Sequence, residues 1–182
     1  MYQKLDTFVI TNEFRGRSKF IVQAWWFIQS SLFSMSPQFL YGWRNMLLRL
    51  FGAKIGKGVI IRPNVRITYP WKLTIGDNSW IGDNAELYTL GEINIGKNTV
   101  ISQKSYLCTG SHDFQSEAFD IYQISIVIED EVWIATDVYI APGVTIGKGA
   151  VIGARSSVFS DMPAGMICIG SPAKPIKARM DK

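Results

Sequence analysis

The sequence predicts an all-β fold, a parallel β-helix that coils as a triangular prism and is preceded by a short helical segment. Within blocks that begin at Ile55, an aliphatic residue recurs every six positions, a period that fits neither an α-helix nor a single strand. Three Ile-Gly pairs open blocks 20 residues apart, at Ile55, Ile75 and Ile95. The residue four positions after most aliphatic positions is small or β-branched. Each six-residue unit is therefore predicted to form one short strand and one corner.

Residues 1–52 are predicted to form a lead-in and a helical cap. The polar start contains no apolar segment behind basic residues, so no signal peptide is expected and the chain is predicted to be cytoplasmic. A helical stripe over residues 19–34 consists of Ile21, Trp25, Ile28 and Leu32. A second helix is predicted over 39–51, ending at Gly52.

The positive charge is concentrated in this cap. Residues 1–51 carry six basic and two acidic side chains, whereas residues 52–182 carry thirteen of each. This asymmetry suggests an anionic surface as partner. The apolar stretch 20–33 would form a helix of about 21 Å, too short for a bilayer core of about 30 Å. Its main predicted role is to cap the open end of the β-helix, with peripheral membrane contact through residues 19–34 as an addition.

Residues 53–178 are predicted to form the β-helix domain, with residues 179–182 as a tail. Three six-residue units make one coil, and stacked coils pair their strands about 4.8 Å apart. Extra residues at 73–74 and 93–94 lengthen the early coils from 18 to 20 residues. The six-residue phase stops at residues 113–127, which are predicted to form an extruded loop.

The single histidine, His112, lies where the regular phase stops. A lone histidine is ordinarily a surface residue, but loops borne on a rigid scaffold often carry function. The position therefore predicts a catalytic histidine. Asp113, Glu117 and Asp120 are candidates to orient it. Asp113 is preferred as catalytic support, because Glu117 and Asp120 also fit solvated loop charges.

Several motifs resemble the hexapeptide-repeat acyltransferases. Thr-Gly-Ser-His-Asp over 109–113, with the following loop, Ile-Glu-Asp-Glu-Val-Trp-Ile over 128–134 and Ile-Ala-Pro-Gly-Val-Thr-Ile-Gly over 140–147 resemble the galactoside, maltose and nodulation-factor sugar O-acetyltransferases. Residues 43–56, 69–73, 101–103 and 108–113 are similar to the colanic-acid-biosynthesis acetyltransferase group.

This resemblance implies a left-handed β-helix and transfer of an acetyl group from acetyl-CoA to a hydroxyl of a sugar or a lipid-linked saccharide. The pathway implied is the biosynthesis of exopolysaccharide, capsule or O-antigen. The site would lie in a cleft between two subunits of a homotrimer. His112 would act as general base, because the neutral imidazole of a histidine can take the proton of a hydroxyl.

The resemblance also assigns binding residues. Asn84 matches an asparagine that contacts the acceptor, although Asn84 also fits a purely structural corner position. The positions that match acetyl-CoA contacts are Trp133, Ala135, Thr136, Ala154, Lys174 and Lys177. Two departures stand out: Ala135 replaces a glycine, and Phe159-Ser160 replaces the Thr-Lys of galactoside-type enzymes, which removes a cation.

Other functions fit less well. Zinc-dependent carbonic anhydrase needs three histidine ligands, so one histidine and two cysteines without metal spacing predict no metal. Serine acetyltransferases usually carry a much larger helical amino-terminal domain. A non-catalytic β-helix scaffold subunit stays open. Nucleic-acid binding is not expected, because the repeat region has no net charge.

Overall fold

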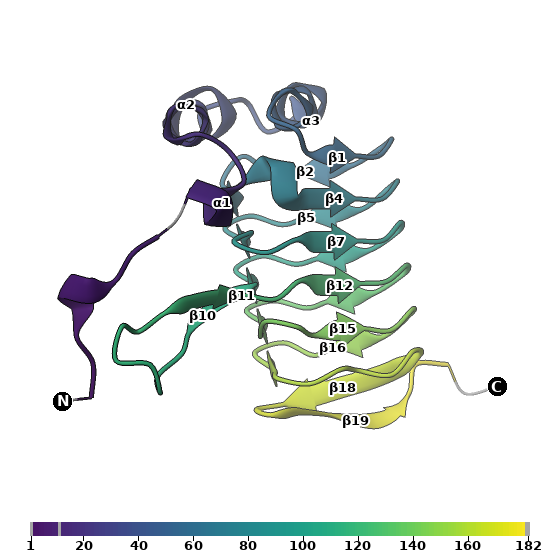
Figure 1. The fold of residues 1–182 in the computed structure, drawn as a ribbon. Helices are drawn as coiled ribbons and strands as arrows, with labels where there is room; N and C mark the ends of the chain where they lie inside the picture. Colours follow the sequence, from purple (N-terminus) through teal and green to yellow (C-terminus); the bar gives the residue numbers. More distant parts are fainter. Residues whose placement is uncertain (1, 11, 181–182) are drawn as a thin grey trace.

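A triangular β-solenoid follows a helical cap in the computed structural model, which describes residues 2–10 and 12–180 (Figure 1). Almost all of its strands are parallel, so the predicted all-β coil is confirmed. The first sheet contains β1 (Lys54–Ile55), β4 (Leu73–Ile75), β7 (Ile93–Ile95), β12 (Ile126–Ile128) and β15 (Thr145–Ile146). The second contains β2 (Ile60–Ile61), β5 (Trp80–Ile81), β8 (Val100–Ile101), β13 (Trp133–Ile134), β16 (Val151–Ile152), β18 (Met166–Gly170) and the antiparallel β19 (Ala173–Ala178). The third contains β3 (Arg66–Ile67), β6 (Glu86–Tyr88), β9 (Tyr106–Cys108), β14 (Tyr139–Ile140) and β17 (Ser157–Val158).

The aliphatic residues of the six-residue units form columns inside the prism. In the second sheet, strand pairing places Ile61, Ile81, Ile101, Ile134 and Ile152 directly above one another. All five side chains are fully buried. Burial of each contributes about 1.5–3 kcal/mol. Slipping a strand by one residue would turn its aliphatic side chain to the outside, so the columns fix the register of the coils.

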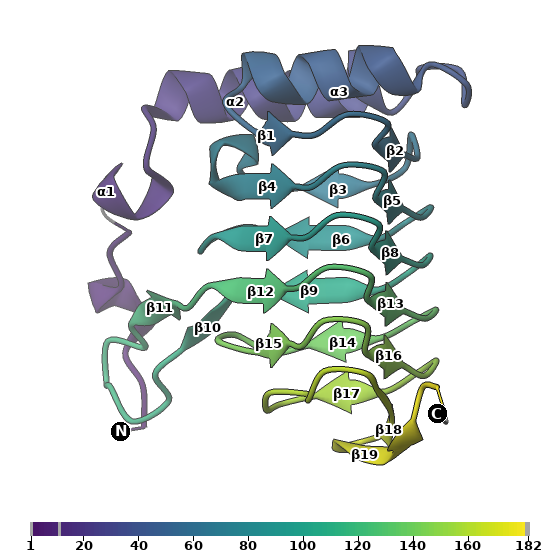
Figure 2. The ribbon, with the colours of Figure 1, turned by 90° about the vertical axis from the view of Figure 1, so that its right-hand side faces the viewer.

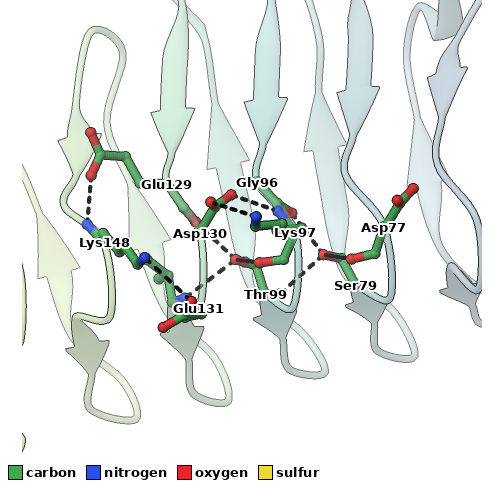
Figure 3. Close-up of polar contacts among 10 residues, drawn as sticks. Asp77, Ser79, Gly96, Lys97, Thr99, Glu129, Asp130, Glu131 and Lys148 are labelled. Carbon is green, nitrogen blue, oxygen red and sulfur yellow. Dashed lines mark hydrogen bonds and ion pairs between the residues drawn. The ribbon is translucent and has the colours of Figure 1, made fainter.

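Polar side chains at the corner between the first and second sheets link successive coils (Figure 3). The Ser79 hydroxyl donates to the Gly96 carbonyl at 2.7 Å, and the Thr99 hydroxyl donates to the Glu129 carbonyl at 2.8 Å. The Glu129 carboxylate accepts from the Lys148 amide at 2.6 Å. The corners are thus held by side-chain bonds where the strand ladder is interrupted.

Asparagines at the corners take up left-handed backbone angles, which this residue type tolerates better than most. Asn78, Asn84 and Asn98 have φ of 59°, 56° and 53°. The extra length of the early coils, however, does not lie at 73–74 and 93–94, which belong to β4 and β7. It lies in the corners just before these strands, because the strands must stay in register with their neighbours.

The helical cap consists of short helices η1 (Leu5–Thr7) and α1 (Asn12–Arg15), then α2 (Lys19–Ile28), the π-helical η2 (Gln29–Phe33) and α3 (Tyr41–Leu50). Figure 2 shows α2 and α3 lying across the end of the prism that begins with β1. The predicted end of the second helix is confirmed, since Gly52 has a φ of 94°.

The predicted stripe on the first helix is partly wrong. Trp25 is buried and Ile28 packs against the core as expected, but Val22 and Phe33 complete the inward face, while Ile21 and Leu32 are exposed. The polar Gln29 also turns inward, because its side-chain oxygen accepts from the Ile67 amide at 2.7 Å. At Gln29, pairing the Ile67 amide of the first coil therefore decides which side of the helix faces inward, and the hydrophobic pattern alone does not.

The cap supplies hydrogen-bond donors to the open edge of the first coil. In every later coil, strand carbonyls accept amide hydrogens from the coil before, as the Ile75 carbonyl does from Gly56. The first coil has no predecessor, and four cap side chains donate to its carbonyls instead. These bonds join Arg49 to Ile55 at 2.9 Å, Asn45 to Val59 at 2.8 Å, Arg44 to Ile61 at 2.7 Å and Trp25 to Ile67 at 2.7 Å.

Replacing Arg44 with methionine is expected to destabilise the fold strongly. Its guanidinium is fully buried and also donates to the Ser36 hydroxyl and the Pro37 and Gln38 carbonyls. Losing these charge-assisted bonds should lower the free energy of unfolding by about 3 kcal/mol. Urea denaturation followed by circular dichroism measures this loss. Arg49→Met, at an exposed position, is the matched control and should cost about 1 kcal/mol; equal losses would contradict the proposed importance of burial.

Candidate functional site

The chain leaves the prism after β9 and forms an antiparallel hairpin, β10 (Gly110–His112) and β11 (Ile121–Gln123). We call residues 110–123 the histidine arm. It projects from the corner between the third and first sheets (Figure 1). The coil starts again at β12, whose first residue lies two positions before the six-residue position Ile128.

The ring of His112 is held from three directions. Its Nδ1 lies 2.7 Å from the Phe119 carbonyl oxygen. The Phe119 ring stacks on it with 4.2 Å between centroids and an interplanar angle of 9°, and the Phe8 ring lies 5.7 Å away at a tilt. A carbonyl can only accept, so Nδ1 carries the hydrogen and the neutral imidazole has its lone pair on Nε2. This tautomer is suited to accept a proton at Nε2.

The predicted carboxylates shape the arm. The Asp113 carboxylate accepts from the Gln115 amide at 2.9 Å, and the Asp120 carboxylate accepts from the Ser116 hydroxyl at 2.7 Å. Both aspartates line a hollow of about 620 Å³ together with His112. The group bonded to Nδ1 is the Phe119 carbonyl, so Asp113 would act on His112 only through the shape of the turn.

Phe119 is a candidate functional residue that sequence reasoning missed. Its backbone carbonyl makes the contact, so its side-chain type carries no signal for this role. Phe119 has a φ of 51°, a left-handed angle that is rare for a bulky residue. Such local strain persists where the surrounding structure requires it, and here it directs the carbonyl toward His112.

Asn84 occupies a corner and also lines a groove. Its positive φ fits the structural interpretation. The groove, of about 720 Å³, runs beneath the helical cap and is also lined by Trp26, Glu86 and Tyr88. Tyr88 packs against a buried cluster that Ile121 of the histidine arm also contacts. Asn84 itself stands at the corner between the second and third sheets, and its groove extends from there along the third sheet.

The predicted acetyl-CoA residues lie on other faces. Trp133 projects outward from β13, 47% exposed, and its indole N–H donates to the Ser102 hydroxyl at 3.1 Å. The next residues turn the corner toward the third sheet: Ala135 is buried, and the Thr136 hydroxyl donates to the Gln103 carbonyl at 3.0 Å. Ala154 is exposed at the same corner.

Lys174 and Lys177 lie farther down, at the end of the prism away from the helical cap. Both are exposed on β19, which pairs with β18 (Figure 1). Their ammonium groups are thus available to an anionic ligand at this end.

One chain does not bring all of these residues together. The histidine arm leaves one corner of the prism, whereas Trp133 stands on the second sheet, which is the face opposite that corner (Figure 2). His112 lies on the arm at the corner between the third and first sheets, whereas Asn84, Thr136 and Ala154 lie at the corner between the second and third sheets. Among the described residues, no group of three or more His, Cys, Asp or Glu side chains is placed to hold a metal ion.

Comparisons with known proteins identify the family. Residues 125–160 match the family model of the bacterial transferase hexapeptide (six repeats), and residues 72–103 match that of the hexapeptide repeat of succinyl-transferase. The chain is 59% identical over 179 residues to an Escherichia coli K12 protein named as a colanic acid biosynthesis acetyltransferase, WcaF, with 98% of each chain covered.

Two solved structures are similar in fold. A maltose O-acetyltransferase from Clostridium difficile 630 superimposes with a TM-score of 0.80 and 28% identity, covering 88% of this chain and 89% of that one. A hexapeptide-repeat acetyltransferase from Vibrio cholerae O1 biovar eltor, complexed with acetyl-CoA, gives a TM-score of 0.81 and 26% identity, covering 90% and 89%. By sequence and by fold, the chain belongs to the hexapeptide-repeat acetyltransferases, which transfer the acetyl group of acetyl-CoA.

Proposed function

We propose that this enzyme acetylates a hydroxyl of a sugar in a polysaccharide precursor, with His112 as general base. The observation that carries the proposal is the Nδ1 contact with the Phe119 carbonyl, which leaves Nε2 as the basic atom. The similarity to a relative named for colanic acid biosynthesis supports an exopolysaccharide pathway. The likeness to a maltose O-acetyltransferase supports a sugar hydroxyl as the acceptor.

The proposed reaction needs one proton to move twice. Nε2 of His112 accepts the hydroxyl proton while the sugar oxygen attacks the thioester carbon of acetyl-CoA. Backbone N–H groups near the base of the arm would stabilise the negatively charged oxygen of the tetrahedral intermediate. The carbon–sulfur bond then breaks, and the thiolate of CoA takes the proton back from the imidazolium. The Phe119 carbonyl stabilises that cation through Nδ1.

The groove that contains Asn84 is the proposed site for the acceptor. The Asn84 amide and the Glu86 carboxylate offer hydrogen bonds to sugar hydroxyls, and Tyr88 and Trp26 offer apolar ring surface. Asn84 would thus serve both the corner and the acceptor.

A second copy of the chain would supply the acetyl-CoA side of the site, as in the homotrimer that the family resemblance implies. The predicted contacts lie on faces away from the histidine arm of their own chain. Trp133 and Trp80 both project from the second sheet, 47% and 52% exposed. A neighbouring subunit that packs beside this sheet would bring its own His112 to the cofactor, with Lys174 and Lys177 near the CoA phosphates.

The outward face of the helical cap is the proposed contact with an anionic membrane surface. Large apolar side chains are exposed along α2, η2, α3 and their connection: Phe20, Ile21, Trp26, Phe27, Leu32, Met35, Phe39, Leu40, Trp43, Met46 and Leu50. The exposed Arg17 and Lys19 flank this face at the start of α2. An apolar helical face with aromatic residues and flanking cations is suited to lie in a membrane interface. The contact proposed for residues 19–34 therefore extends to α3.

This surface also bears on the acceptor. Trp26 belongs to the exposed face and to the lining of the Asn84 groove. A saccharide carried on a lipid would reach the groove while its lipid stays in the membrane, on the cytoplasmic side. Within residues 2–10 and 12–180, no helix has the length and apolarity needed to cross a membrane.

Changing His112 to alanine is expected to reduce turnover by about 10²–10⁴-fold, the usual contribution of a positioned base. Acetyl-CoA turnover against nucleotide sugars, free sugars, lipid-linked oligosaccharides and serine measures this and identifies the acceptor. Asp113→Asn is the matched control in the same arm and should change turnover little, because the Asp113 carboxylate contacts the Gln115 amide. Full activity of the His112 variant would refute the assigned base.

Mixed assemblies test whether two chains share one site. Chains with His112→Ala and chains with Trp133→Ala are co-expressed with different tags, and assemblies that carry both tags are purified. In a cyclic trimer, one site of the three would combine an intact histidine with an intact tryptophan, so about one third of wild-type activity should return. Activity equal only to the weighted average of the two single variants would place the site within one chain.

Vesicle sedimentation tests the membrane contact. The full-length chain should sediment with phosphatidylglycerol vesicles at low salt, and a Phe20→Ser/Phe27→Ser variant should lose most of this binding because both side chains are largely exposed. Ile176→Ser removes an exposed apolar side chain from β19 and serves as the control. Absence of sedimentation, or equal loss in the control, would contradict the proposed surface.

A further inference from the structure

Lys72 occupies a position that the proposed chemistry does not use. It ends the short helix η3 (Pro70–Lys72), in the corner between the third and first sheets. Its half-buried ammonium donates to the Phe14 carbonyl at 2.8 Å, to the Leu90 carbonyl and to the Gln123 side-chain oxygen at 2.8 Å. A lysine ammonium has three hydrogens, and these contacts account for all of them.

The three acceptors belong to three separate parts of the molecule. Phe14 lies in α1, between the amino-terminal segment and α2. Leu90 lies in the turn between β6 and β7 of the prism, and Gln123 is the last residue of β11 in the histidine arm. One side chain therefore ties the amino-terminal segment and the arm to the scaffold.

A carboxylate and two aromatic rings surround the half-buried Lys72 ammonium. Burial lowers the pKa of Lys72, and the nearby Glu92 carboxylate opposes that shift. The ammonium also lies 5.6 Å from the centre of the Phe14 ring and 5.7 Å from that of Tyr69, within the range of cation–π attraction. These contacts offset the cost of removing the charge from water.

The same cluster holds the arm by apolar contacts. Tyr69 and Leu90 are buried together, and Ile121 of β11 packs against them. On the other strand, a side-chain carbon at Gly110 would lie 2.6 Å from the end of the Leu90 side chain, so any larger residue there would displace Leu90. Leu90 thus packs beside both strands of the arm while its carbonyl binds Lys72.

The pairing within the hairpin connects this anchor to the histidine. Gln123 is opposite Gly110, and Ile121 is opposite His112. Because the ladder fixes each residue of β10 against its partner on β11, holding Gln123 and Ile121 also fixes where His112 stands.

We propose that Lys72 is a positioning residue that sets the place of His112 by fastening the base of the histidine arm to the prism. Lys72 touches Gln123, not the reacting atoms, and acts through the hairpin. The inference rests on the proposed function of His112 as the base.

Lys72→Met keeps the length of the side chain and removes all three donors. Turnover should fall about tenfold, because a misplacement of about 1 Å in a catalytic group can cost up to about 100-fold. The KM for acetyl-CoA should stay within about twofold, since the predicted acetyl-CoA contacts lie on other faces. Lys57→Met, at an exposed corner lysine, is the control and should match the wild type. Wild-type turnover in Lys72→Met would overturn the inference.

A double-mutant cycle tests the path through the arm. Gln123→Met removes only the bond between Lys72 and the arm and leaves the Phe14 and Leu90 contacts in place. If Lys72→Met does not fold, the turnover of Gln123→Met alone still tests the inference. The double variant should be about as slow as Lys72→Met alone, and a loss equal to the product of the two single effects would contradict a shared contact.

Hydrogen exchange separates this inference from the assignment of the base. Amides of residues 110–123 should exchange faster in Lys72→Met, while those of β4 and β7 stay protected. If His112→Ala is fully active, the proposed function fails, yet the exchange result still reports on the anchor. If His112→Ala is inactive and Lys72→Met exchanges like the wild type, only the positioning role fails.

Discussion

The open edge of the first coil is the constraint on which the rest of the molecule depends. Each coil obtains its hydrogen bonds from the coil before it, and the first coil obtains them from Arg44, Asn45, Arg49 and Trp25. With that edge paired, the isoleucine columns hold every later strand in register. Additions to the chain then have to lie at corners, and the corner between the third and first sheets carries both η3 and the histidine arm.

The repeat could be predicted closely from sequence, because buried aliphatic side chains at a fixed period leave little choice of register. The break in the repeat could also be predicted, since the phase stops beside His112, but the arm runs over 110–123 and includes His112, whereas the predicted loop began at 113 and ended at 127. The contacts that hold the arm could not be predicted from the sequence. Phe119 acts through a carbonyl, and Lys72 meets partners 58, 18 and 51 residues away in sequence. Such contacts depend on the folded path and leave no local pattern.

The helical cap shows the same limit. Its amphipathic pattern predicts a helix correctly but misplaces the buried stripe, because Gln29 turns inward to serve the Ile67 amide. The more apolar residues, such as Phe20 and Phe27, consequently face outward. In the proposed function, the outward face of the cap orients the enzyme on a membrane surface. The site shared between two chains makes its activity depend on assembly.

The pairing of the first coil has a further consequence for how copies of the chain can meet. An unpaired strand edge is a template for another chain, and a solenoid with a bare end can grow into a fibre. Here the carbonyls of Ile55, Val59, Ile61 and Ile67 are already occupied. Copies of the chain therefore cannot extend the ladder end to end at the cap.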